Sequence, residues 1–410
     1  MPAKYFSLFF IFFYIQTFLF AQYYPREEEP PLSDQAIISL ITGSPGEQLY
    51  TRFGHSAIRI YDPATGYDKV YNYGTFDFDT PGFYRKFLQG KLNYSLSRYD
   101  FNRMLMSYKY FNQTLYEQVL NLSYPDKIKV YEFLNTNYQP ANRFYLYDFF
   151  FDNCSSRIRE VFKSVLGDGL VFQGEFIGKH KTFRQLLDEY LQNQTPWGDF
   201  GIDLVLGLPA DQVASSKDYM FLPYELFRAF DHALIIDNNG EQEKFVSQNN
   251  IILQEIKTDP NKSWFTPINI FIGIFILSTL LTVRGIKIKK NVKVIDIVLF
   301  SIIGLAGLIL ALLWFATDHI ATKNNLNLIW AFPTHIFIPF LLYNKKLRKF
   351  TSYYFLFWSI FLTLFLIGWN YLPQQLNMAI IPIILLMILR LYLLYQEKKK
   401  ILKNNVERRK

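Results

Sequence analysis

The chain has 410 residues, of which 50% are hydrophobic and 19% aromatic, with a formal net charge of +8 and one cysteine. A single cysteine excludes a disulfide within the chain, and a basic balance of this size would ordinarily suggest nucleic-acid binding. Sixteen of the 43 basic residues, however, fall in three short segments between or after apolar stretches near the C-terminus, so the rest of the chain is net negative. We therefore expect no nucleic-acid partner.

The first residues, MPAKYFSLFFIFFYIQTFLFAQYYP, have the layout of a secretory signal peptide. Lys4 precedes an apolar run and Ala21 is a plausible cleavage position, which predicts a signal peptide over residues 1–21. An uncleaved anchor is the alternative, because Leu19 is not the small residue expected two positions before the cut.

Residues 22–262 contain no long apolar run and have the length of one α+β domain. Alternating or buried apolar patterns predict strands at 36–42, 55–62, 68–76, 91–99, 113–123 and 142–150. Helical spacing and capping residues predict helices at 100–111, 125–138, 154–166, 182–192, 198–207 and 222–231. A last hairpin is expected to turn at 237–240.

The composition changes abruptly after Trp264. Five apolar stretches follow, at 265–283, 294–315, 326–343, 353–371 and 379–395. Most are long enough to cross a membrane as helices, which takes about 20 residues. The third stretch is the weakest, because Pro333 and His335 lie inside it. We expect an all-α membrane domain of five helices over residues 263–410.

Charges between these stretches predict the orientation of the chain. Lysine and arginine gather in the loops 284–293 and 344–350 and in the tail from Gln396, whereas the two alternate loops hold only Lys323. The positive-inside rule therefore places the basic segments and the C-terminus in the cytoplasm. The same rule predicts that the large N-terminal domain is exported.

Cys154 lies in this exported domain, where thiols usually form disulfides, yet the chain offers it no partner. Such a cysteine forms an intermolecular disulfide, is a free reactive thiol, or is a small buried hydrophobe. The segment DNCSSRIREVF places it where an amphipathic helix begins, and the unpaired N–H groups and positive dipole of a helix N-terminus favour a thiolate. We interpret Cys154 as a nucleophile, with Asn153 and Ser155 as candidate oxyanion donors and Asp152 and Arg157 as supporting residues.

A cysteine nucleophile needs a base, and the exported domain has three histidines. His55 is favoured because it begins a predicted strand, whose end would hold the ring rigidly; His180 lies in a polar loop and His232 at a helix-to-strand junction. The group that orients the base is expected on the neighbouring strand. The candidates are Asn72 and Tyr73 there, with Asp148 and Asp152 near the thiol as alternatives.

The outward-facing loop before the third apolar stretch is unusually polar. Its polar residues, with two from the stretch itself, are Asp318, His319, Lys323, Asn324, Asn325, Asn327 and His335. Polar groups at membrane depth are costly and often functional, which suggests a lipid-headgroup site formed by His319, Asn325, Asn327 and His335; a plain interfacial loop is the alternative. We expect neither metal nor cofactor, because the chain has no HExxH motif and no clustered His/Cys set.

Three segments in this order, FGHSAIRIYD, YNYGTFDF and DNCSSRIRE, resemble the permuted branch of the papain-like (NlpC/P60-like) thiol enzymes, in which the histidine strand precedes the cysteine helix. Lecithin:retinol acyltransferases share this order. With the segment WGDFGIDLVLG and the membrane part, nearly the whole chain resembles the Lnb-type lipoprotein N-acyltransferases of Gram-negative bacteria. In this resemblance, the Cys–His pair of the family falls on Cys154 and His55.

The resemblance implies an acyl transfer in the bacterial inner membrane, with the thiol domain in the periplasm. Cys154 would take an acyl chain from a phospholipid as a thioester and pass it to the α-amine of a diacylglyceryl-lipoprotein. Two other functions remain open from the residues: a membrane-anchored cysteine amidase or peptidase acting on peptidoglycan, and a non-catalytic scaffold in envelope assembly.

Overall fold

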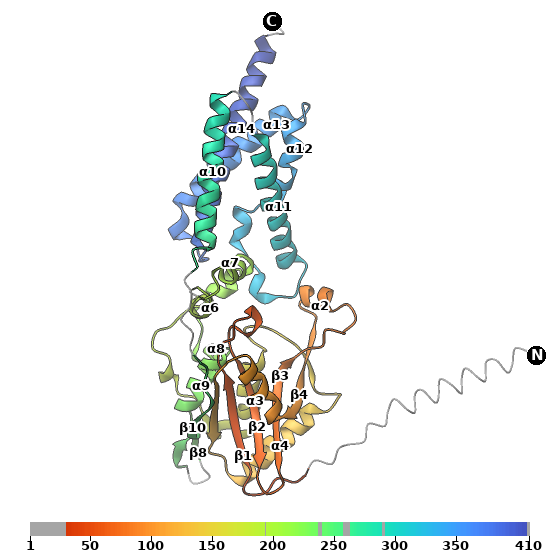
Figure 1. Cartoon of the computed structure of the whole chain (residues 1–410), viewed down its shortest axis with the longest axis vertical. Coiled ribbons are helices and arrows are strands. Elements are labelled where there is room, and N and C mark those ends of the chain that lie inside the picture. The colour runs from red at the N-terminus through yellow and green to blue at the C-terminus, as the bar shows by residue number, and fades with distance from the viewer. Residues whose placement is uncertain (1–29, 193, 237–239, 257–262, 289–291, 408–410) are drawn as a thin grey trace, which may run out of the picture.

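The computed structural model describes residues 30–192, 194–236, 240–256, 263–288 and 292–407, so the predicted signal peptide lies outside the described residues. A β-sheet with its helices forms one end of the molecule and a group of long helices forms the other, with α6 and α7 between them (Figure 1). The fold thus has an N-terminal domain built on an antiparallel sheet and a C-terminal helical domain.

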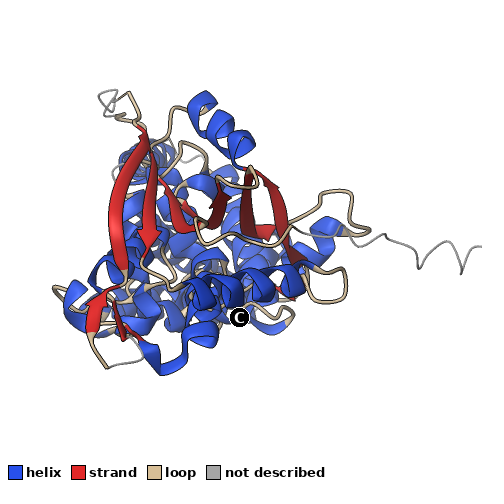
Figure 2. Cartoon of the chain, turned by 90° about the horizontal axis from the view of Figure 1, so that it is seen from below, coloured by secondary structure: helices blue, strands red, loops and turns tan. Residues whose placement is uncertain are grey.

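Among the described residues, the central sheet has seven strands, and every neighbouring pair is antiparallel. In order across the sheet, they are β10 (Val246–Leu253), β5 (Leu115–Leu120), β1 (Ile37–Gly43), β2 (His55–Asp62), β3 (Tyr67–Thr75), β4 (Asn93–Asp100) and β6 (Phe144–Leu146). The six strands predicted from alternation are confirmed, with the last shortened to three residues. Figure 2 shows the strands as a curved layer.

Helices pack on both faces of the sheet because its central strands are buried on both sides. On one face, α5 (Cys154–Leu166) contributes Ile158, Val161 and Phe162 to the main core, beside α4 (Tyr124–Tyr138). On the other face, α3 (Phe101–Tyr110) packs Phe101 and Met104 against the sheet. The predicted helical spacing in α5 is therefore confirmed, and it fixes the first residue of the helix, Cys154, at the edge of the core.

The remaining elements of the N-terminal domain follow α5. They are the helices α6 (Phe183–Leu191), α7 (Pro196–Val205), α8 (Ser216–Tyr219) and α9 (Pro223–His232), and the strands β7 (Leu170–Val171), β8 (Leu234–Ile236) and β9 (Gln242–Lys244) of a small second sheet. The predicted hairpin is confirmed by the pairing of β8 with β9, although its turn lies outside the described residues. Two helices, α2 (Phe83–Gln89) and the short α8, were not predicted.

The C-terminal part contains four described helices long and apolar enough to cross a membrane. They are α10 (Pro267–Lys287), α11 (Lys293–Phe315), α13 (Arg348–Ile367) and α14 (Ile381–Glu407). The third predicted stretch differs from a straight span: Ile320–Ile329 and Pro333–Tyr343, which includes α12 (Ile338–Tyr343), are bent by 53°. Pro333 explains the break, because proline lacks the N–H that would continue a helix. The count is five only if this bent pair forms one span.

Candidate active site

Cys154 is the first residue of α5, and a capping box fixes that helix start. The Asn153 side chain accepts hydrogen bonds from the N–H groups of Ser155 (2.9 Å) and Ser156 (3.0 Å), and Ser156 Oγ accepts one from Asn153 N (2.8 Å). The first N–H groups of a helix have no intrahelical acceptor and carry the positive end of its dipole. The thiol of Cys154 therefore lies in a field that favours its anion.

Asn153 is a predicted oxyanion donor through its side chain or its backbone, but its Nδ2 and its N–H both donate elsewhere. Its Oδ1 is used in the capping box, and its Nδ2 donates to the carbonyl oxygens of Phe149 (2.8 Å) and Phe221 (2.9 Å). With every polar atom of this buried amide engaged, Asn153 positions the helix instead. The backbone N–H of Cys154, at the helix start, is the better candidate for an oxyanion donor.

His55 begins β2 and meets the thiol across Gly74 of the next strand. A methyl group placed on Gly74 would lie 3.7 Å from Cys154 Cβ and 3.9 Å from His55 Cε1, so the two side chains are close neighbours. Gly74 has a φ of +89°, and the β3–β4 register shifts between Asn72 and Thr75. A residue with a side chain would be strained in this left-handed backbone. Glycine therefore permits the bulge, and the bulge lets Cys154 and His55 approach each other closely.

Of the candidates for the orienting group, Asn72 is the one that contacts His55. His55 Nε2 and Asn72 Oδ1 are 2.5 Å apart, which leaves Nδ1 of the ring for the thiol. Asn72 Nδ2 in turn donates to the hydroxyl of Tyr99 at 3.1 Å. Because successive strand residues face opposite ways, Tyr73 points into the core, where its hydroxyl donates to Asn137 at 2.5 Å. The structure thus brings Cys154, His55 and Asn72 together and leaves Tyr73 apart.

The thiol and the imidazole shift each other's pKa in the direction that favours the charged forms. Burial by itself raises the pKa of Cys154, but the charge of His55, its hydrogen bond, and bonds from Ser56 N–H and Ser155 lower it to about 7. Burial by itself lowers the pKa of His55, whereas the Cys154 charge and hydrogen bonds with Cys154 and Asn72 raise it above the usual value. Both side chains are only half-buried, so the pair remains accessible to a substrate.

The other predicted supporting residues lie beside the thiol without binding the imidazole. Ser155 Oγ lies 3.8 Å from Cys154 Sγ and 3.1 Å from Ser56 Oγ. Asp152 accepts a hydrogen bond from Arg157 at 2.8 Å, so it is engaged in an ion pair. The guanidinium of Arg157 also stacks on a tyrosine ring, that of residue 145. These contacts brace the start of α5.

The alternative candidates for base and orienting group take other contacts. Asp148 Oδ1 accepts from the N–H groups of Phe150 and Phe151 and so closes the turn before α5. His232 ends α9, with its Nδ1 2.9 Å from the Arg228 carbonyl oxygen, and His180 is exposed. Neither histidine contacts the thiol in the described part of the chain.

Sequence patterns missed the tyrosines around this pair. Tyr99 lies diagonally across the β3–β4 ladder from Asn72, which faces Ser97, so the contact depends on strand register. Burial, and then the neighbouring Cys154 charge, raises the pKa of Tyr145 and Tyr147, so both remain neutral phenols at physiological pH. The one available signal was the alternation of FYLY, which sends residues 145 and 147 to the same face.

The four predicted headgroup residues do not converge on one open site. The Nδ2 of Asn325 donates to the carbonyls of Leu204 and Val205, and that of Asn327 donates to those of Asp203 and Leu204. These are end carbonyls of α7 that lack a helical partner, so both buried amides tie the N-terminal domain to the membrane part.

The two histidines of that prediction lie elsewhere. His335 is fully buried and its Nδ1 lies 2.9 Å from the Tyr354 hydroxyl. His319 Nε2 lies 3.0 Å from the carbonyl oxygen of Phe87, in α2. Contrary to the predicted headgroup site, Asn325, Asn327 and His335 are buried in the protein, and a headgroup has no access to them in this structure.

Two family matches divide the chain as the fold does. Residues 32–189 match the Lnb N-terminal periplasmic domain, and residues 259–401 match the Lnb transmembrane domain. Comparison with curated proteins and with solved structures gave no match. The first match contains His55, Asn72 and Cys154, and the second contains the four long apolar helices up to residue 401 of α14. With both domains in one chain, this protein is a membrane protein of the Lnb type, with a periplasmic N-terminal domain.

Proposed function

We propose that this protein is a lipoprotein N-acyltransferase that moves an acyl chain from a phospholipid, through a thioester on Cys154, to the α-amine of a diacylglyceryl-lipoprotein cysteine. The observation that supports this most strongly is the position of the Cys154 thiol. It lies at a helix N-terminus beside His55 and Asn72, and its pKa is lowered to about 7. The Lnb matches favour acyl transfer over other thiol chemistry.

In the first step, the Cys154 thiolate attacks the ester carbonyl of the donor lipid. The carbonyl oxygen becomes an oxyanion beside the N-terminus of α5, where the Cys154 N–H is a candidate donor. The ester C–O bond then breaks, and His55 gives its proton to the leaving alkoxide, so a lysophospholipid departs. The acyl chain remains on sulfur as a thioester.

In the second step, the amine of the lipoprotein attacks the thioester. Neutral His55 takes a proton from the amine as the C–N bond forms, and the C–S bond breaks to release the thiolate. Asn72, bound to Nε2, keeps Nδ1 of the ring directed to the thiol in both steps. The products are an N-acylated lipoprotein and the original thiolate–imidazolium pair.

Helix α2 supports a lipid as the donor. Exposed apolar side chains line it and the loop before it: Phe76, Phe78, Tyr84, Phe87 and Leu88. Its end is tied to the residues that follow the apolar helix α11, since Asp318 N donates to Gln89 O at 2.9 Å, and α2 lies beside that end of α11 (Figure 1). An apolar surface at the end of a membrane helix suits the lipid interface, and exposed Arg85 suits phosphate headgroups.

The same proposal covers the finer architecture. It takes the thiol domain, residues 22–262, as a permuted papain-like fold, and residues 263–410 as five spans with the bent pair as the third. It takes residues 1–21 as a signal peptide, the inner membrane as the location and the cytoplasm as the side of the C-terminus. The basic loops support this orientation.

A transfer assay tests the function. Full-length protein would be mixed with phospholipid carrying an isotope-labelled acyl chain and with a diacylglyceryl lipopeptide, and products would be read by mass spectrometry. We expect labelled N-acyl lipopeptide with the wild type and none with Cys154→Ser. Equal product with Cys154→Ser would refute the proposal, and cleavage of peptidoglycan fragments without acyl transfer would replace it with the amidase function.

A further inference from the structure

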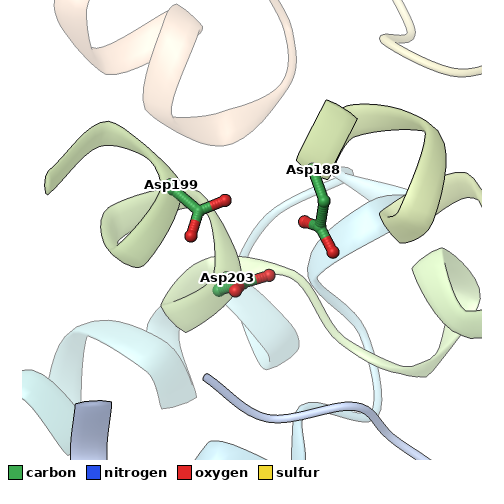
Figure 3. A group of neighbouring side chains, drawn as sticks. All are labelled: Asp188, Asp199 and Asp203. Carbon is green, nitrogen blue, oxygen red and sulfur yellow. The ribbon is translucent and has the colours of Figure 1, made fainter. Parts of the chain in front are cut away.

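Three aspartates form a buried acidic cluster apart from the thiol. Asp188 comes from α6, and Asp199 and Asp203 come from α7, where they are one helical turn apart. One carboxylate oxygen from each lies within 4.8 Å of the others, and the residues are only 8%, 7% and 5% exposed. Figure 3 shows the carboxylates of Asp188 and Asp199 directed to the space between them, with Asp203 beside it.

The cluster carries more negative charge than its neighbours neutralise. Arg184, fully buried, pairs with Asp203 at 2.7 Å and with Asp211 at 3.0 Å. Within the described residues, neither Asp188 nor Asp199 forms an ion pair. One guanidinium therefore faces four carboxylates, and buried charge without a counter-ion is costly.

Asp199 also has an oxygen that nothing in the described chain satisfies. Its Oδ1 is buried and has no hydrogen-bond partner, while its Oδ2 accepts only a long bond of 3.3 Å from Asn377. Asp188 is likewise served by one 3.3 Å bond, from Gln375. Burial, followed by repulsion from the neighbouring aspartates, raises the pKa of Asp188 to about 7 and that of Asp199 to about 6. Asp188 and Asp199 thus have few hydrogen-bond donors and no cationic partner among the described residues.

We propose that Asp188, Asp199 and Asp203 bind one divalent cation of the calcium type. Hard cations take carboxylate oxygens, and Ca²⁺ tolerates an irregular set of six to eight ligands completed by water, whereas Mg²⁺ demands near-octahedral geometry. A surface pocket of about 450 Å³ is lined by Asp188 and Gln375, together with Gln185, Glu189 and Gln192. This pocket gives a hydrated ion a route to the cluster.

The cluster lies where the membrane domain contacts α6 and α7, so a bound ion would act on that contact. Gln375 and Asn377 belong to the loop between α13 and α14, and they contact all three aspartates. An ion that neutralises the aspartates therefore stabilises the docking of this membrane-domain loop on α6 and α7. This inference is independent of the proposed transferase chemistry.

Terbium luminescence tests the site on full-length protein in detergent after chelator treatment. Trp197, two residues before Asp199 on α7, is a suitable sensitiser. We expect saturable Tb³⁺ luminescence that Ca²⁺ displaces, and at least a tenfold loss of Ca²⁺ affinity in Asp199→Asn and Asp188→Asn. Asp168→Asn, which changes a fully exposed aspartate, should bind as the wild type does.

Thermal unfolding provides the second measurement. Ca²⁺ should raise the unfolding temperature of the wild type and of Asp168→Asn but not that of Asp199→Asn, which should fold because it removes repulsion. Absence of saturable Ca²⁺ binding up to about 10 mM, beyond the range of weak extracellular calcium sites, would overturn the proposal. The proposal would also be overturned if Ca²⁺ left the unfolding temperature unchanged while that temperature fell as the pH rose through 6 to 7. Protons shared by the aspartates, and not an ion, would then neutralise the cluster.

Discussion

The ionisation of Cys154 depends on a balance between burial and the imidazole of His55, and it can be measured because the chain has no other thiol. With a pKa of about 7, the thiol is protonated at pH 5.5 and ionised at pH 8, so its alkylation by iodoacetamide should accelerate through pH 7. Transferase activity should fall in the same way as the pH drops below 7.

His55→Ala should shift this profile to higher pH. The substitution removes the charge and hydrogen bond that lower the thiol pKa and leaves the burial that raises it. The half-point of alkylation should therefore move above ~8.5, the pKa of a free cysteine, because burial still raises the pKa of the thiol. An unchanged half-point in His55→Ala would show that the imidazole does not control the thiol.

Asn72→Ala tests the orientation of the base. Loss of the 2.5 Å contact frees the ring to rotate, and we expect the acyl-transfer kcat to fall at least about tenfold, part of the ~10²–10⁴ that a positioned base contributes. Tyr73→Phe is the matched control, since it removes the neighbouring hydroxyl on the opposite face. It should cost about 1 kcal/mol of stability and leave kcat unchanged. Equal losses of kcat in the two variants would contradict this assignment.

Residue types and chain order were sufficient to propose Cys154 and His55, because a lone exported thiol and a histidine at a strand start are local features. They placed Asn72 only among four candidates for the orienting group. Tyr99 and the acidic cluster were not predictable in this way. The first requires the β3–β4 register, and the second requires the packing of α6 against α7, which joins residues 188 and 203. Neither is encoded in a short pattern.

Strand β3 carries the element on which the site geometry depends, the bulge at Gly74. Gly74→Ala places a side chain at φ +89°, at a cost of about 1–2 kcal/mol, and relaxation of the bulge should separate Cys154 from His55. A shift of about 1 Å can cost 10²-fold in rate, so we expect activity to fall at least tenfold. Gly66→Ala, at φ +74° in an open turn, should lose similar stability and keep full activity. Full activity in Gly74→Ala would exclude the bulge as a determinant.

Helix α2 should govern access of the donor lipid. Changing Phe78, Tyr84 and Leu88 to serine removes apolar surface from the proposed interface, and KM for phospholipid should rise about tenfold, equivalent to ~1.4 kcal/mol, with kcat nearly unchanged. Serine at Tyr110 and Phe111, exposed at the end of α3, is the control for apolar content. A KM that responds equally to both sets would refute a specific lipid contact at α2.

Periodicity predicted most elements of the N-terminal domain, because strands such as β2 alternate and α5 has a clear apolar face. It did not predict α2, since that helix has only one buried residue, Phe83, and therefore no apolar stripe facing a core. The third apolar stretch was recognised by composition, but its bend of 53° follows from Pro333 and from docking on α7. Composition alone does not predict such docking.

The two domains act as one molecule in this account. Asn325, Asn327 and Gln374 of the membrane part bind the carbonyls at the end of α7, and α2 reaches the end of α11. The thiol domain is thereby held beside a lipid surface by contacts on two sides. Any trapped intermediate should therefore be sought with the full chain and with lipid in the form of a membrane or mixed micelle.

The most direct test is the mass of the peptide that contains Cys154 after full-length protein has been incubated with a phospholipid of defined acyl chains and no acceptor. We predict the mass of one acyl chain on that cysteine, labile to neutral hydroxylamine as a thioester is, and lost when a diacylglyceryl lipopeptide is added. An unmodified Cys154 in protein that still transfers acyl chains would contradict the account.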